Sequence, residues 1–297
     1  SAIEDMAGMA ILCSDKTGTM TLNKMQLQPE APIYCKGESQ YSLLRYAALA
    51  AKWKEPAKDA LDTLILGAVD VMSLGHMELL EHMPFDPVVK RTEGTVRDQV
   101  TGAVFKVTKG APHVILKLVQ RANDSMISQV ESDIFELCSR GVRCLAVART
   151  DPLGEWVLLG LLTFLDPPRP DTLQTILDSK KYGVAVKMIT GDHLLIAKET
   201  SRRLMLGTEI LSPNVLPNLD PLTGQKPADL SDQYGAMILE ADGFAEVFPE
   251  HKYLIVECLR EMGFKTGMTG DGVNDAPALK RADVGIAVQG STDAARA

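Results

Sequence analysis

Two carboxylate-rich segments lie about 250 residues apart in this chain, and each follows a short apolar run. The first reads CSDKTGT at residues 13–19, after the run 8–13, and the second reads TGDGVNDAP at residues 269–277, after the run 263–268. Runs of this length are typical of buried parallel strands rather than helices. The strands of an open α/β sheet end at one crevice, where ligands bind. We therefore expect both segments to contribute to a single active site.

Asp15 stands at the expected carboxyl end of the first strand. A carboxylate that attacks a phosphoryl group forms an acyl phosphate, and the groups around it must neutralise the transferred charge. Lys16 and the small turn 17–19 offer a cation and backbone N–H groups for that purpose. The same residues could also form an ordinary polar turn after a strand. The first segment alone leaves both interpretations open, because short motifs often match by chance.

The second segment supplies oxygen ligands. Asp271, Asn274 and Asp275 follow the expected strand, and a short helix is expected after them. Hard oxygen ligands suit Mg²⁺, which commonly takes one or two protein carboxylates plus phosphate oxygens. Asp271 is the first candidate for a metal ligand. Asn274 and Asp275 could hold a phosphate, orient Lys252, or cap the following helix.

A third segment lies between these two. Residues 182–189 form another expected buried strand, which ends in Thr190, Gly191 and Asp192 ahead of an expected helix over 193–200. A hydroxyl and a glycine amide just before a helix N-terminus can cradle a phosphate. Asp192 could equally be the N-cap of that helix, and the two roles are compatible.

A fourth segment covers residues 247–252, where Pro249 is well placed as the first residue of an amphipathic helix. Lys252 follows in the first turn of that helix and is a candidate phosphate clamp. Most lysines in such a position are solvated, so this assignment depends on the other three segments.

In this order the four segments resemble the signature loops of the haloacid-dehalogenase-like phosphotransferases, and their amino-acid sequences are similar to those of the P-type cation-transporting ATPases. Residues 15–19 resemble the phosphorylation motif of that family, 190–192 its phosphate loop, Lys252 its phosphoryl-binding lysine and 269–277 its hinge motif. The plasma-membrane proton-pump branch is resembled at residues 2–9, 22–24, 166–169, 248–253 and 292–296. The resemblance covers nearly the whole chain and is weakest over 29–75 and 212–232.

The resemblance implies an α/β fold, with a Rossmann-like parallel sheet of the haloacid-dehalogenase type and an inserted α+β domain on an antiparallel sheet. We expect a phosphorylation domain at residues 1–27 and 166–297 and a nucleotide-binding domain at 28–165. In the insertion we expect helices over 41–53, 57–72 (opened by Pro56), 111–119 and 125–140, and antiparallel strands over 79–85, 92–97, 103–108, 142–148 and 155–165. An irregular surface segment is marked by Pro213, Pro217, Pro221 and Pro227.

The catalytic set implied by the resemblance is Asp15, Lys16, Thr17, Thr190, Gly191, Asp192, Lys252 and Asn274. The implied Mg²⁺ ligands are Asp15, Thr17, Asp271 and Asp275. Phosphatases of the superfamily carry an Asp two residues after the nucleophile as general acid and base, whereas this chain has Thr17. The aspartyl phosphate should therefore hydrolyse slowly. The resemblance implies that the base comes from a separate actuator domain with a Thr-Gly-Glu motif, a triplet that this chain lacks.

The ATP site implied by the resemblance consists of Phe85, Lys90, Lys109, Gly110 and Arg143. An aromatic face, a glycine-lined pocket and cations suit adenosine triphosphate. Phe85 could instead be a core aromatic. His113 and Pro87 depart from the residues that relatives often carry there, so the nucleotide affinity is expected to differ.

Composition limits the other possibilities. A net charge of −8 argues against nucleic-acid or anionic-membrane partners. No apolar stretch reaches the roughly 18 residues that span a bilayer. Five cysteines without Cys-x-x-Cys spacing suggest reduced thiols in a cytosolic setting.

We therefore expect a soluble, monomeric headpiece from the cytoplasmic face of a plasma-membrane proton pump. Its expected partners are ATP, Mg²⁺ and the actuator and transmembrane domains of the complete pump. A soluble phosphatase of the same fold is disfavoured by Thr17 and by the large insertion. A non-catalytic nucleotide-binding module is disfavoured by the intact set of carboxylates.

Overall fold

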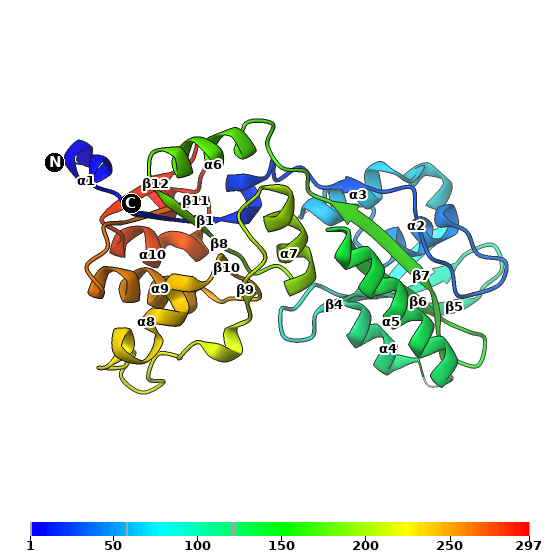
Figure 1. Cartoon of the computed structure of the whole chain (residues 1–297). Helices are drawn as coiled ribbons and strands as arrows, with labels where there is room; N and C mark the ends of the chain where they lie inside the picture. The colour runs from blue at the N-terminus through cyan, green and yellow to red at the C-terminus, as the bar shows by residue number, and fades with distance from the viewer. Residues whose placement is uncertain (1, 58, 120–122, 297) are drawn as a thin grey trace. The chain divides into compact units, whose positions relative to one another are not determined.

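The computed structural model describes residues 2–57, 59–119 and 123–296 (Figure 1). The chain divides into two compact units. Unit 1 combines Ser1–Lys24 with Asp166–Ala297, and unit 2 is Met25–Leu165. The first boundary falls after Lys24 rather than after residue 27. The reason is that strand β2 (Gln26–Leu27) pairs with strand β7 (Trp156–Leu165) in the sheet of unit 2.

Unit 1 is built on a parallel sheet whose described strands lie in the order β12-β11-β1-β8-β10-β9 (Figure 1). Their bounds are β1 Ile11–Asp15, β8 Ala185–Ile189, β9 Ile210–Leu211, β10 Gly243–Phe244, β11 Thr266–Gly270 and β12 Val284–Ala287. β1 lies between β8 and β11 and runs parallel to both. These three strands are buried along most of their length, as a sheet covered on both faces requires. Their carboxyl ends therefore lie side by side.

Helices cover both faces of this sheet. The helices of unit 1 are α1 Ala2–Ala7, α6 Thr172–Lys181, α7 Leu194–Arg203, α8 Leu230–Glu240, α9 Pro249–Glu261, α10 Ala276–Arg281 and α11 Asp293–Arg296. One apolar core joins the sheet to α8, α9 and α10, with Phe244 and Leu254 among its fully buried members. A second core joins Met188 to Ile176 of α6 and Ala197 of α7. Pro249 opens α9 as expected.

Unit 2 is built on an antiparallel sheet in the order β2-β7-β6-β5-β4-β3. The strands not yet given are β3 Met77–Met83, β4 Arg91–Asp98, β5 Val104–Gly110 and β6 Arg143–Thr150, and the helices are α2 Gln40–Leu49, α3 Ala60–Gly67, α4 Pro112–Leu118 and α5 Asp124–Ser139. One core joins α2 and α3 to Val107 and Leu159. The other joins α4 and α5 to Ala146 and Leu161. All five expected strands are found, shifted by up to two residues at their ends.

The expectation for the second helix of the insertion was wrong. Pro56 does not open it; α3 begins at Ala60 behind Asp59, whose Oδ1 accepts the backbone N–H of Asp62 at 2.8 Å. That side-chain cap satisfies a free N–H group, which a proline cannot do. The helix also ends at Gly67, and a separate 3₁₀ turn follows at Val71–Leu74. Residue 58 lies outside the described residues. Throughout the described parts of the chain, no helix is long and apolar enough to cross a bilayer.

Candidate active site

Asp15 is the last residue of β1 and is 7% exposed. Lys252, in the first turn of α9, donates a hydrogen bond from Nζ to Asp15 Oδ1 at 2.6 Å. The same Nζ donates to Asp275 Oδ1, also at 2.6 Å. Lys252 is itself only 5% exposed, so it forms a buried bridge between two carboxylates that are 260 positions apart in the chain. The sequence placed Asp15 and Lys252 in one candidate site without predicting a contact between them, and the structure brings the two side chains together.

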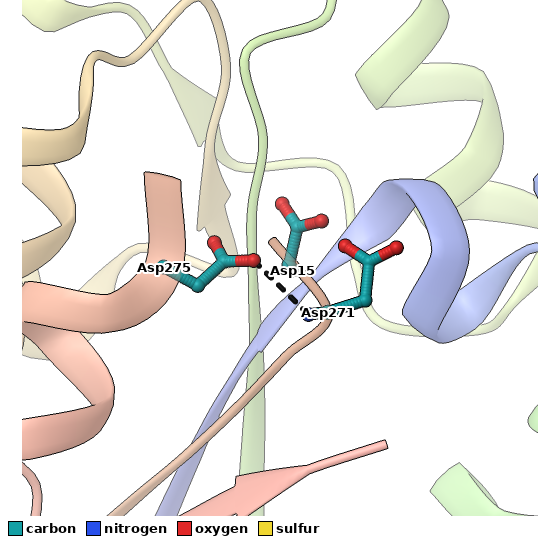
Figure 2. Close-up of side chains that lie close together, drawn as sticks. All are labelled: Asp15, Asp271 and Asp275. Atoms are coloured by element: carbon teal, nitrogen blue, oxygen red, sulfur yellow. Dashed lines mark hydrogen bonds between the residues drawn. The ribbon is translucent and has the colours of Figure 1, made fainter. Parts of the chain in front are cut away.

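Three carboxylates gather at this strand end (Figure 2). Asp15, Asp271 and Asp275 each place a carboxylate oxygen within 4.8 Å of the others. Asp275 Oδ2 accepts the backbone N–H groups of Asp271 at 3.1 Å and Gly272 at 3.2 Å. With Oδ1 on Lys252, both oxygens of Asp275 are engaged by protein donors. Asp275 is buried, and its contact with Lys252 is the geometry expected for one of the roles that the sequence left open for it.

The charges in this group are strongly coupled. Burial raises the pKa of Asp15 to about 6, while the charge of Lys252 opposes the rise and that of Asp275 adds to it. Burial and the charge of Asp275 also raise the pKa of Asp271. Burial disfavours the charged form of Lys252, but attraction to Asp15 and Asp275 outweighs it and raises the pKa of Lys252. Three carboxylates around one ammonium leave an excess of negative charge, and a bound cation would relieve it.

Lys16 connects the turn after Asp15 to the segment after β8. Its Nζ lies 2.6 Å from Asp192 Oδ2, and both residues are buried. The backbone N–H of Asp192 donates to Thr190 Oγ1 at 3.1 Å. Asp192 is not the N-cap of α7; that position belongs to His193, whose Nδ1 accepts the N–H of Leu195 at 3.3 Å. The Asp192 carboxylate instead forms the ion pair with Lys16.

The turn after Asp15 approaches Asp271 closely. Thr17 is extended, whereas Gly18 has a φ of 82°, a conformation that favours glycine. A Cβ added at Gly18 would collide with Asp271 Oδ2, so the turn can reach the carboxylate only because this residue has no side chain. Asn274, in the 3₁₀ turn Val273–Asp275, is exposed.

Asp166 and Arg169 support the same turn, a role that the sequence did not reveal. Arg169 donates from Nη2 to Gly18 O at 2.6 Å and from Nε to Thr19 O at 2.9 Å. Asp166 accepts a hydrogen bond from Thr21 Oγ1 and another from the backbone N–H of Lys24. The sequence did carry a signal for this role, because Asp166 and Arg169 follow directly after the long insertion. Residues 166–169 were used above only for the resemblance to the proton-pump branch.

Unit 2 places the expected nucleotide residues at one end of its sheet. Arg91 pairs with Gly110 in the β4–β5 register, so the end of β5 lies beside the turn that follows Phe85. A Cβ at Gly110 would meet Lys90 O at 2.5 Å, which explains the glycine. Arg143 begins β6 at the same end of the sheet.

The side chains of these residues differ in exposure. Phe85 is 58% exposed and is therefore not a core aromatic, which removes that alternative. Lys90 is also exposed and has a φ of 54°. Lys109 is buried, with Nζ 2.7 Å from Asp62 Oδ1 and 3.1 Å from Thr92 Oγ1. Asp62 was missed by the sequence reasoning, because only the fold brings α3 to the end of β5.

Sequence comparisons identify the family. A family model described as haloacid dehalogenase-like hydrolase matches residues 9–283, and the chain belongs to that family. The expected α/β fold class is thereby confirmed.

Its relatives are more specific. Along its whole length the chain is 57% identical to the probable proton ATPase 1A of Leishmania donovani, 44% to plasma membrane ATPase 1 of Saccharomyces cerevisiae and 45% to a putative cation-transporting ATPase of Methanocaldococcus jannaschii. The chain spans 30%, 32% and 36% of the lengths of these relatives. The resemblance to cation-transporting ATPases, and to their proton-pumping branch, is confirmed.

Proposed function

We propose that this chain is the catalytic headpiece of an ATP-driven proton pump, in which the γ-phosphate of ATP is transferred to Asp15. The observation that carries the proposal is the surroundings of Asp15: a buried strand-end carboxylate with the ammonium of Lys252 at 2.6 Å and two further carboxylates beside it. The relatives named as proton ATPases support the choice of proton as the transported ion.

In the proposed reaction an oxygen of Asp15 attacks the γ-phosphorus of ATP. A bond forms between that oxygen and phosphorus, the bond from phosphorus to the bridging oxygen breaks, and ADP leaves. A pKa of about 6 keeps most of the Asp15 carboxylate ionised at pH 7. Lys252 is placed to neutralise charge on the transferred group. Thr190 and Gly191, held by the Lys16–Asp192 pair, supply a hydroxyl and an amide for the phosphate oxygens.

The carboxylate cluster fits Mg²⁺ by the chemistry of its donors, which are hard oxygens at a strand end. We propose Asp15, Thr17 and Asp271 as the residues that hold it. Asp275 is assigned to orienting Lys252, because both of its oxygens already accept hydrogen bonds from the protein. When bound, Mg²⁺ supplies positive charge to the phosphate oxygens.

ATP is proposed to bind unit 2. The exposed ring of Phe85 offers a stacking face for adenine, and Lys90 and Arg143 offer cations at the same end of the sheet. Lys109 and Gly110 complete the proposed site, with Asp62 holding the Lys109 ammonium.

The product is proposed to be long-lived in this chain. Thr17 occupies the position from which a phosphatase would supply a general base. We assign that base to an actuator domain of the complete pump, and we place the pump in the plasma membrane with this headpiece on its cytoplasmic face.

The test is labelling with ATP carrying a radioactive γ-phosphate, followed by acid quenching and gel separation. The chain should retain acid-stable label, and Asp15→Asn should retain none. Asp178→Asn is the matched control, because Asp178 is an exposed carboxylate on α6. Rapid release of inorganic phosphate without retained label would indicate a phosphatase instead. Nucleotide binding with neither label nor release would indicate a binding module.

A further inference from the structure

His251 is buried directly beside the reactive lysine. It is 3% exposed and precedes Lys252 in the first turn of α9. Its Nδ1 accepts the backbone N–H of Phe248 at 3.1 Å, and its Nε2 lies 3.0 Å from Asn218 Oδ1. Asn218 lies between β9 and α8, in the proline-marked segment that the sequence indicated as an irregular surface segment.

These two contacts are compatible with only one neutral tautomer of the His251 ring. The N–H of Phe248 points at Nδ1, so Nδ1 carries no proton. A neutral imidazole must then carry its hydrogen on Nε2, which donates to Asn218 Oδ1. Burial lowers the pKa of His251, with Glu250 opposing the change, so the neutral form is favoured at pH 7. A proton on Nδ1 would bring two hydrogen-bond donors into contact, the ring N–H and the backbone N–H of Phe248.

The ring provides one of the two contacts of a capping box. The residue before α9 is Phe248, whose side chain cannot accept a hydrogen bond, and Pro249 follows as the first helical residue. His251 is the third residue of the helix and reaches back to the N–H of Phe248, which is the N3 half of a capping box. The first turn of α9 is thereby fixed. Lys252, with its long flexible stem, projects from that turn onto Asp15 and Asp275.

We propose that His251 and Asn218 form a positioning pair that sets Lys252 for phosphoryl transfer to Asp15. The inference rests on the proposed function of Asp15 as phosphate acceptor. Neither residue touches the reacting atoms; the pair acts by holding the helix turn that carries Lys252, and it ties the surface segment at Asn218 to the active site.

A double-mutant cycle between positions 251 and 252, measured as the rate of acid-stable labelling, tests whether His251 acts through Lys252. His251→Leu removes the acceptor for Phe248 and should slow labelling by about 10-fold to 100-fold at saturating ATP, the scale of a misplaced catalytic group. Its affinity for ATP should be unchanged. His251→Gln, whose Oε1 can accept the same N–H, should recover most of the lost rate. In a Lys252→Arg background, His251→Leu should have little further effect, because coupled residues are not additive.

Two results would contradict the role proposed for His251. An equal slowing by His251→Leu with Lys or Arg at position 252 would show a general structural effect and overturn the proposal, as would an unchanged rate in His251→Leu. Thermal unfolding of each variant checks that it is folded.

A second measurement does not depend on catalysis. Nitrogen NMR of the histidine ring at pH 7 should show an unprotonated Nδ1 and a protonated Nε2, and the same tautomer should persist in Asn218→Leu, because the N–H of Phe248 still donates to Nδ1. A protonated Nδ1 in the unmodified chain would overturn the positioning pair. Absence of labelling in the unmodified chain, together with the expected NMR result, would instead refute the function proposed for Asp15.

Discussion

Replacing Asp15, the proposed nucleophile, should stabilise the folded chain. The pKa of Asp15 rises from its ordinary 3.8 to about 6 on folding, so the folded state disfavours the ionised carboxylate. The difference is about 2 pKa units, and each unit corresponds to about 1.4 kcal/mol, giving roughly 3 kcal/mol as an upper bound. Asp15→Asn also removes the favourable interaction of the Asp15 carboxylate with the Lys252 ammonium. We therefore expect this substitution to raise the free energy of unfolding by about 1–3 kcal/mol at pH 7.5.

The sign of the pH dependence follows from the raised pKa. Below pH 3.8 Asp15 is protonated in both states and carries no penalty; the penalty grows as the pH rises and is complete above about pH 6. The advantage of Asp15→Asn should therefore be about half as large at pH 5 as at pH 7.5. Urea unfolding in the presence of a chelator measures it at both pH values, with Asp178→Asn as the control. A less stable Asp15→Asn chain at pH 7.5, or an advantage that grows toward acid, would refute the reasoning.

Three further outcomes are expected. Mg²⁺ should raise the thermal midpoint of the unmodified chain, and Asp271→Asn should lose more of that increase than Asp275→Asn, as judged by scanning calorimetry; equal losses would contradict the assignment of the metal ligands. Phe85→Ala and Lys109→Ala should each weaken ATP binding by about 1–3 kcal/mol in calorimetric titration. Of the two, only Lys109→Ala should also lower the free energy of unfolding, because it leaves the Asp62 carboxylate without its buried partner. Thr17→Asp, if it still accepts phosphate, should shorten the lifetime of the phosphorylated chain by up to about 10²–10⁴-fold; an unchanged decay rate would show that residue 17 does not control hydrolysis.

The central strands were predictable from the sequence because they are buried on both faces. β1 begins with the apolar run Ile11–Cys13, β8 is apolar except for Lys187, and β11 reads TGMTG, a strand of small and polar residues around Met268; each of the three leads into a polar turn. The strands β2, β9 and β10 have two residues each, too few to show any period. β2 and β10 pair with the longer strands β7 and β8, and β9 pairs with β10 at the edge of the sheet. The second helix of the insertion was misplaced because its start depends on the Asp59 side chain rather than on Pro56.

The active-site residues were predictable as types, but several of their partners were not. The turn after Asp15 and the segment ending in Asp275 each carried a recognisable pattern. The clamp of Arg169 on Gly18 joins residues about 150 positions apart, and no local period signals such a contact. His251 likewise read as one more residue of an amphipathic helix until the fold placed Asn218 against its ring.

The central claim is that ATP phosphorylates the Asp15 carboxylate. Borohydride reduces an acyl phosphate to an alcohol, so reduction after incubation with Mg-ATP should convert Asp15 to homoserine, which peptide mass spectrometry can locate. We predict this conversion at position 15 in the presence of ATP and its absence without ATP. Conversion at a different carboxylate, or none in a chain that consumes ATP, would contradict the account.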